Sequence, residues 1–183
     1  MTLKHWKSLS VSTIFRNPWW TYRKFVYEIE PGKTGEYHSV HTNGAAMVVP
    51  VTSRGTVLLV NQYRFLLDRE SIEFPCGGVK EGATHDETAW HELAEETGYS
   101  AMQLHLVGAF NPYNGVTNEM CHVYLAQDLR EVGADPDETE EFEIVELTPA
   151  EIDARIRSGE IWDGMSIAAW AIAGERVAGL MPP

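Results

Sequence analysis

Three glutamates, Glu92, Glu95 and Glu96, are spaced so that they would lie on one side of a helix. At about 100° per residue, positions i, i+3 and i+4 fall on one arc, where like charges repel by roughly 0.2–0.5 kcal/mol per pair. A bound cation would remove this repulsion, and Mg²⁺ or Mn²⁺ binds through a few carboxylates, waters and a substrate phosphate. The triplet therefore suggests a divalent metal site, with a solvated acidic face as the alternative.

A helix over residues 85–97 would position these glutamates. Thr84 and Glu87 fit a capping box, in which both side chains satisfy backbone donors at a helix start, and Gly98 suits the residue just past a helix end. An apolar arc, separate from the glutamates, is expected to pack against the body of the protein. Its members are Ala89, Trp90, Leu93, Ala94 and Thr97.

The segment 77–99 resembles the Nudix box, whose pattern is Gly, five residues, Glu, seven residues, Arg-Glu-apolar, one residue, Glu-Glu, one residue, Gly-apolar. The residues in register are Gly77, Glu92, Leu93, Glu95, Glu96, Gly98 and Tyr99. The resemblance implies that the helix glutamates bind divalent metals. Ala83 and His91 stand where the pattern has Glu and Arg, a pair thought to support the loop and orient the helix.

His91 has three interpretations. An imidazole one turn before Glu95 could be an added metal ligand, a proton carrier, or a polar helix residue paired with Glu87 or Glu95. We favour the pairing.

Bulk composition points to one globular unit, because 183 residues with 44% hydrophobic content can bury one good core. A formal charge of −13 argues against nonspecific binding to nucleic acid. The first ten residues lack a signal peptide's apolar core, and no apolar run is long enough for a membrane span, so we expect a cytoplasmic protein. Two cysteines are too few for a disulfide framework.

Strands are expected on both sides of this helix. Alternation over 22–29 and a second run at 36–41 predict an N-terminal hairpin, and Trp19 and Trp20 before it could stack a base or pack in a dimer contact. Continuous apolar runs at 45–51 and 56–62 predict strands buried on both faces. Further expected elements are strands at 104–110, 120–125 and 144–147, a helix from Pro149, and a final helix after Asp163 through Ala173.

The segments 61–65 and 71–78 resemble the ADP-ribose pyrophosphatase branch of the Nudix family. In that branch, Arg64 would meet the diphosphate, and its planar fork suits phosphate oxygens. Glu73 would lie near the substrate or metal, Gly77 at the substrate, and the backbone carbonyl of Cys76 on a metal.

Two loops complete the site that the resemblance implies. Between 111 and 119, Pro112, Gly115 and Glu119 would shape the pocket for the terminal ribose, and Tyr113 would offer a stacking surface or a hydroxyl group. In the acidic run 135–143, we assign the general base to Glu138 and an extra metal ligand to Glu140. Glu141 follows close behind, and several neighbouring glutamates compete for each role.

Together these features predict a Nudix-type α/β/α sandwich with a mixed sheet and an N-terminal β hairpin extension. Residues 1–43 would form the extension, which the resemblance implicates in homodimer formation, and residues 44–183 the Nudix domain. The expected reaction is Mg²⁺-dependent (or Mn²⁺-dependent) hydrolysis of a nucleoside diphosphate derivative, foremost ADP-ribose or a related sugar nucleotide, to a nucleoside monophosphate and a sugar phosphate. The alternatives are a catalytically weakened nucleotide-binding or sensor protein and a Nudix hydrolase of another nucleotide.

Overall fold

The computed structural model describes residues 3–133 and 141–180. In chain order the elements are β1 (Lys7–Arg16), β2 (Thr21–Glu30), β3 (Lys33–His41), β4 (Ala45–Pro50), β5 (Val57–Arg64), the short 3₁₀ helix η1 (Phe65–Leu67), β6 (Arg69–Glu73), β7 (Cys76–Gly78), α1 (His85–Thr97), β8 (Tyr99–Ser100), β9 (Gln103–Phe110), β10 (Cys121–Gln127), β11 (Arg130–Glu131), β12 (Glu143–Leu147), α2 (Pro149–Ser158) and α3 (Gly164–Gly179). The predicted helix over 85–97 is confirmed at both ends, and each predicted strand is present within a few residues.

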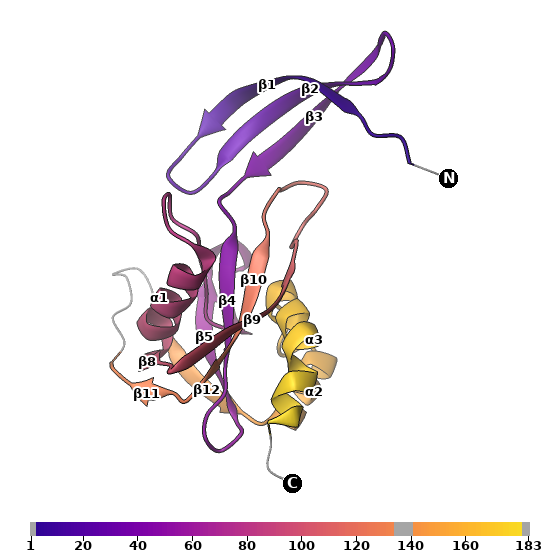
Figure 1. Ribbon diagram of the computed structural model, residues 1–183. Helices are drawn as coiled ribbons and strands as arrows, with labels where there is room; N and C mark the ends of the chain where they lie inside the picture. The colour runs from indigo at the N-terminus through magenta and orange to yellow at the C-terminus, as the bar shows by residue number, and fades with distance from the viewer. Residues whose placement is uncertain (1–2, 134–140, 181–183) are drawn as a thin grey trace.

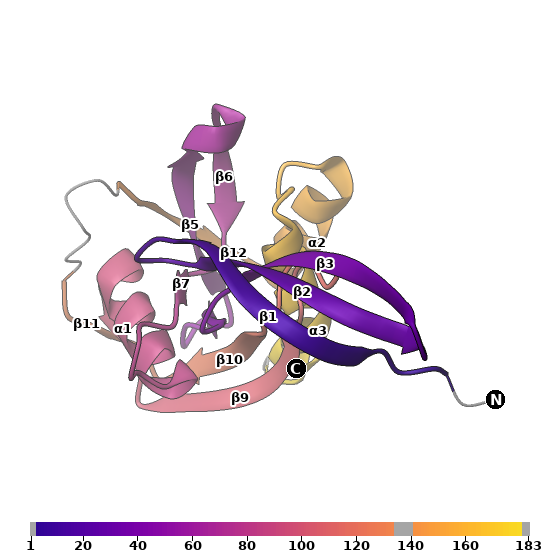
Figure 2. The same cartoon turned by 90° about the horizontal axis from the view of Figure 1, so that it is seen from above.

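The body is built in layers around a four-stranded mixed sheet with strand order β7-β4-β10-β9. Strand β4 runs parallel to β10 and antiparallel to β7, and β9 is antiparallel to β10. Helix α1 covers one face, while α3 and α2 lie on the other (Figure 1). A second sheet, β12-β5-β6, lies beside the first, and its β5–β6 hairpin projects from the body (Figure 2). The predicted α/β/α sandwich with a mixed sheet is confirmed.

Strand β4 is buried on both faces, as its continuous apolar run predicts. Because side chains alternate along a strand, its residues enter two separate hydrophobic clusters. Ala46 and Val48 pack in the cluster that contains Leu93 of α1, whereas Met47 and Val49 join the larger cluster, which contains Ala169 of α3. The helix that carries the glutamates is therefore held against the central strand. Burial of each large apolar side chain stabilises this packing by about 1.5–3 kcal/mol.

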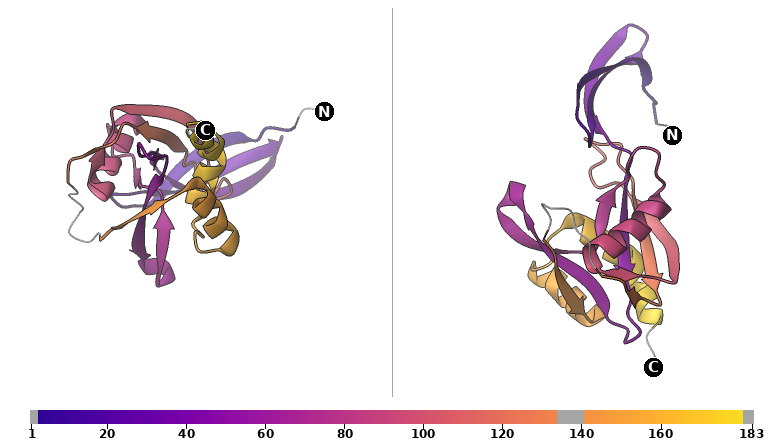
Figure 3. Two further views of the ribbon diagram at one scale, coloured as in Figure 1. Left: turned by 90° about the horizontal axis from the view of Figure 1, so that it is seen from below. Right: turned by 90° about the vertical axis from the view of Figure 1, so that its left-hand side faces the viewer.

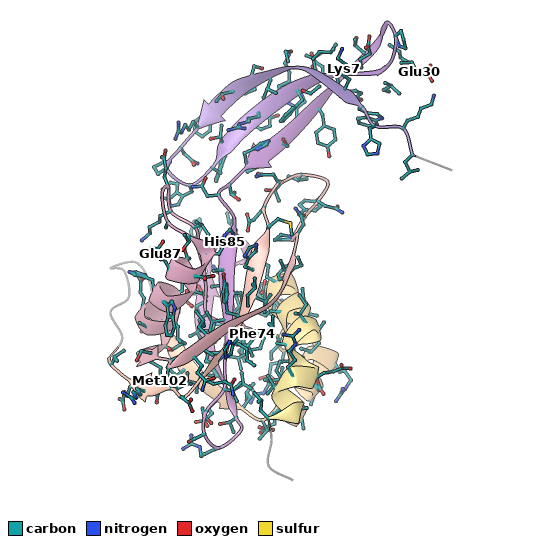
Figure 4. The ribbon with its side chains drawn as sticks, viewed as in Figure 1. Lys7, Glu30, Phe74, His85, Glu87 and Met102 are labelled. Carbon is teal, nitrogen blue, oxygen red and sulfur yellow. The ribbon has the colours of Figure 1, made fainter. Side chains whose placement is uncertain are left out.

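The N-terminal region is a three-stranded antiparallel sheet that stands away from the body (Figure 3, right). The predicted hairpin is present as β2–β3, and β1 pairs with the free edge of β2. Strand β1 was not predicted, although β-branched Val11, Thr13 and Ile14 favour a strand. Lys7 and Glu30 mark the end of this sheet far from the body (Figure 4). The division into residues 1–43 and 44–183 stays a prediction.

Among the helices that the structure describes, none has both the length and the apolar character needed to cross a membrane. The cytoplasmic location stays a prediction.

Candidate active site

Helix α1 begins at a complete capping box. The Glu87 N–H donates to Thr84 Oγ1 at 3.1 Å, and the Thr84 N–H donates to Glu87 Oε2 at 2.8 Å. These bonds from Thr84, the backbone bond first, lower the pKa of Glu87. The helix ends at Gly98, whose φ of 72° is in the left-handed region that glycine adopts freely. His85 and Glu87 place this first turn at the end of α1 nearest the N-terminal sheet (Figure 4).

The buried face of α1 differs from the predicted apolar arc. Ala89, Leu93 and Thr97 are buried as expected, but Trp90 is 39% exposed and Glu96 is only 5% exposed. At 100° per residue, the buried arc is rotated by roughly a quarter of a turn toward the glutamates. The prediction of a packed face that includes Trp90 and is separate from the glutamates is therefore wrong, because β7 offers a backbone N–H to Glu96.

Glu96 is held by the backbone of β7. The Cys76 N–H donates to Glu96 Oε2 at 3.2 Å. Cys76 lies opposite Met47 of β4, and the neighbouring pair, Val48 and Pro75, is joined by a bond from the Val48 N–H to the Pro75 carbonyl. Because hydrogen-bonded and non-hydrogen-bonded pairs alternate along an antiparallel ladder, the backbone N–H and carbonyl of Cys76 point away from β4. Its carbonyl oxygen therefore lies on the same edge as Glu96. This arrangement suits the predicted oxygen ligand.

Glu92 lies directly against Gly77. A β-carbon added at Gly77 would overlap the Glu92 carboxylate, whereas one added at the neighbouring Gly78 would meet nothing within 4 Å. The absence of a side chain at Gly77 therefore lets a carboxylate approach the backbone of β7 closely. A β-carbon at this position would push aside the end of the flexible Glu92 side chain, so glycine here preserves the position of that carboxylate.

Glu95 lies beside His91. The His91 Nδ1 and Glu95 Oε2 atoms are 2.7 Å apart, so the favoured pairing of the histidine is confirmed. One ligand atom from each of His91, Glu92 and Glu95 lies within 4.8 Å of the others. The outer part of α1 thus carries a mixed nitrogen and oxygen donor set.

Arg64 and Glu73 form a two-point ion pair beside this helix. Arg64 Nε donates to Glu73 Oε1 at 2.8 Å, and Nη2 donates to the second carboxylate oxygen. Glu73 is 3% exposed, but the Arg64 side chain is 45% exposed. The pKa of Arg64 is raised, chiefly by the bond to Glu73 and further by the charges of Asp163 and Glu96. The guanidinium is thus fixed on one side, near the carboxylates, and open to an anion on the other.

The loop between β9 and β10 is tied to the N-terminal region. Tyr37 Oη donates to the Gly115 carbonyl at 2.7 Å, and Thr42 Oγ1 donates to Glu119 Oε2 at 3.3 Å. Tyr113 on the same loop is exposed. The structure therefore places Glu119 beside Thr42, at the junction between the N-terminal sheet and the body.

A groove of about 430 Å³ opens between that sheet and this loop. Phe25 and Tyr27 alternate on β2 and so face it together, and Trp6 stacks on Tyr27 with ring centroids 4.4 Å apart. This groove was not predicted, although the alternation of aromatic residues on β2 was a signal for it. Residues from both sides form the lining: Trp6, Ser8, Phe25, Tyr27, Tyr37, Ser39, His41, Asn114, Val116, Thr117 and Asn118.

Comparisons with known proteins agree with this geometry. The NUDIX domain model matches residues 41–163. The chain belongs to the Nudix family. An ADP-ribose pyrophosphatase from Bacillus subtilis is 35% identical over 144 residues, which cover 78% of each chain. A GDP-mannose pyrophosphatase from Pectobacterium atrosepticum is 28% identical over 163 residues, 81% of this chain and 84% of that protein.

A crystal structure of an ADP compounds hydrolase superposes on this Nudix protein with a TM-score of 0.85. The superposition covers 98% of this chain and 97% of that chain, and the two sequences are 23% identical. This likeness supports the fold. The family match and the relatives confirm the prediction of a Nudix pyrophosphohydrolase.

The two departures from the Nudix box meet in space. Ala83 and His91 line one cavity of about 160 Å³ with Lys80, Glu87 and Glu92. The short Ala83 side chain thus lies in the same cavity as the imidazole.

The structure describes most of the predicted site residues of this Nudix protein, but not all of them. Glu92, Glu95, Glu96, Cys76 and Gly77 meet where α1 crosses β7, with Arg64 and Glu73 beside them. The predicted base Glu138 and the predicted ligand Glu140 lie outside the described residues, and Glu141 is exposed.

Proposed function

We propose that this Nudix protein hydrolyses the diphosphate bond of ADP-ribose or a related sugar nucleotide, with a divalent metal ion. For ADP-ribose the products would be AMP and ribose 5-phosphate. The observation that carries this proposal is the contact between α1 and β7, where Glu92 and Glu96 approach the backbone of Gly77 and Cys76. The names of the two relatives support a sugar-linked nucleoside diphosphate as substrate.

The residues present fit a divalent metal. Oxygen donors suit Mg²⁺, with Mn²⁺ as the alternative, and the cradle at Gly77 keeps the Glu92 carboxylate against the strand. The carboxylates of Glu92, Glu95 and Glu96 and the carbonyl of Cys76 would hold the ion, with Glu140 as a further ligand. When bound, the metal would supply positive charge to the diphosphate and lower the pKa of a coordinated water.

The other residues of the chain would bind and orient the substrate. Arg64, fixed by Glu73, would donate its remaining N–H groups to phosphate oxygens and stabilise the charge that develops there. Glu138 would take the proton from the attacking water. Tyr113 and Glu119 would contact the terminal sugar.

Hydrolysis of a panel of nucleoside diphosphate derivatives, with Mg²⁺ and with Mn²⁺, tests this proposal. Glu92→Gln and Glu96→Gln should each lower the rate by at least about 10³-fold, since each removes a ligand charge while keeping an oxygen acceptor. Glu175→Gln, at an exposed position on α3, is the matched control and should keep the wild-type rate. Wild-type rates in both α1 variants would refute the metal assignment.

A nucleotide-binding protein with weakened catalysis is the second candidate, because Ala83 and His91 replace the Glu and Arg of the Nudix box. The product analysis separates the two. A sensor would bind the nucleotide and metal without forming phosphate monoesters.

We also infer a homodimer formed through the N-terminal sheet. Strand β1 is exposed along its whole length and presents Leu9, Val11, Ile14 and Phe15 to solvent. A three-stranded sheet with this much exposed apolar surface fits a contact between two copies.

A further inference from the structure

His91 sits where α1 can offer a nitrogen donor to a metal ion. It is four residues before Glu95, and Glu92 is three residues before Glu95, so both side chains leave the helix next to that of Glu95. Ligand atoms across a metal with bonds of 2.0–2.2 Å lie up to roughly 4.4 Å apart. Because the donor atoms of these three residues already lie within 4.8 Å of one another, only small side-chain rotations are needed to close around an ion.

The cavity beside His91 has room for the remaining ligands. Its volume of about 160 Å³ is larger than a single water needs, so it leaves room for water ligands. Ala83 lines this cavity with only a methyl group, and Lys80 and Glu87 supply opposite charges on its rim. A hydrated cation held by His91 and Glu92 therefore fits without displacing the backbone.

We propose that His91 is a direct ligand of the active-site metal, and that the set of His91, Glu92 and Glu95 makes this site favour Co²⁺, Ni²⁺ or Zn²⁺ over Mg²⁺. The inference rests on the metal site of the proposed function and replaces Mg²⁺ there with a later first-row ion. Imidazole nitrogen binds these later first-row ions well, whereas Mg²⁺ takes oxygen donors almost exclusively. The other role for His91 is a hydrogen bond that only orients Glu95.

Proton NMR of the Co²⁺-loaded protein, without substrate, distinguishes these roles. A directly bound imidazole gives a strongly shifted, solvent-exchangeable N–H resonance, and this resonance should be present in the wild type and absent in His91→Gln. His105→Gln, at an exposed histidine on β9, is the matched control and should retain it. A spectrum of His91→Gln identical to the wild type would overturn the proposal. The variant should fold, because the His91 side chain is 62% exposed.

Calorimetry with Co²⁺ and Mg²⁺ gives the second measurement. We expect His91→Gln to weaken Co²⁺ binding by at least about tenfold, and Mg²⁺ binding by less than about threefold. His91→Arg, which restores the Nudix pattern, should reverse the preference toward Mg²⁺. Equal losses for both ions in His91→Gln would overturn the proposal.

The glutamate variants keep this proposal separate from the proposed function. If Glu92→Gln and Glu96→Gln lose metal binding while His91→Gln keeps the wild-type preference, the inference on His91 fails and the metal-dependent hydrolase stands. If neither glutamate variant loses metal binding, the metal site itself is wrong and both proposals fail.

Discussion

Gly77 and Glu92 show how one side chain's absence positions a carboxylate. The Glu92 carboxylate occupies the space that a β-carbon at Gly77 would need, so the two residues depend on each other. Glu92 is half-buried and its side chain is flexible, so an added methyl group would be relieved by movement of the carboxylate. We therefore expect the geometry of the metal site to be sensitive to a single methyl group on β7.

Gly77→Ala should lower the rate by about 10²-fold, because a displacement of about 1 Å in a catalytic group has an effect of that size. Its free energy of unfolding should change by less than about 1 kcal/mol, because the end of the flexible Glu92 side chain can move aside. Gly78→Ala is the matched control, since its added methyl group meets open space, and both values should stay near wild type. Rate assays and urea unfolding measure the two effects, and equal rates for the two variants would contradict the role of Gly77.

At the scale of elements, the capping box of α1, Pro149 and Asp163 predicted where the helices start, whereas α3 continues to Gly179, beyond the predicted Ala173. Thr84, Glu87 and Gly98 are local signals, because capping depends on residues only a few positions apart. The buried face of α1 was not predictable in this way. It depends on the N–H of Cys76, twenty residues before Glu96, and on the register between β4 and β7.

The two capping boxes allow stability and function to be separated. Thr84→Ala on α1 and Thr148→Ala on α2 should each lower the free energy of unfolding by about 1 kcal/mol, because each removes an equivalent cap. Only Thr84→Ala should also lower the hydrolysis rate, since it loosens the first turn of the helix that carries the metal site. Urea unfolding and rate assays measure both. A lower rate in Thr148→Ala of similar size would contradict this division.

The contact between α1 and β10 should make stability depend on pH. His85 and His122 stack with ring centroids 3.8 Å apart, and burial, followed by the charge of His85, lowers the pKa of His122 below its ordinary value of 6.5. The unfolded chain therefore binds a proton at His122 more readily than the folded protein does. Stability is then greatest above about pH 6.5 and falls as the pH drops through the folded pKa.

His122→Gln should reduce this fall in melting temperature between pH 8 and pH 5. His41 also has a lowered pKa, from burial and then the charge of Arg23, so some pH dependence should remain. His105→Gln, at an exposed position, serves as the control. Unchanged pH dependence in His122→Gln would rule out this histidine as the cause. The carboxyl group of Glu87, whose pKa is lowered, titrates below this pH range.

At the scale of the whole molecule, the body and the N-terminal sheet differ in what holds them together. In the described part of the chain, the two hydrophobic clusters draw all of their buried residues from position 45 onward. The sandwich was predictable because its apolar runs and helix signals are strong. Strand β1 of the N-terminal sheet was not predictable in this way, because it is exposed throughout and has no buried face to impose an alternating apolar pattern.

Removal of residues 1–43 should therefore leave a folded body. Circular dichroism should show a cooperative thermal transition, because both clusters are retained. The segment 111–120 should exchange its amide hydrogens faster, as it loses the bonds from Tyr37 to Gly115 and between Val40 and Val116. Light scattering should give twice 20.6 kDa for the full chain and a monomer for the shortened one. A shortened chain that remains dimeric would place the contact between copies on the body, and one that unfolds would show that the sheet contributes to the core's stability.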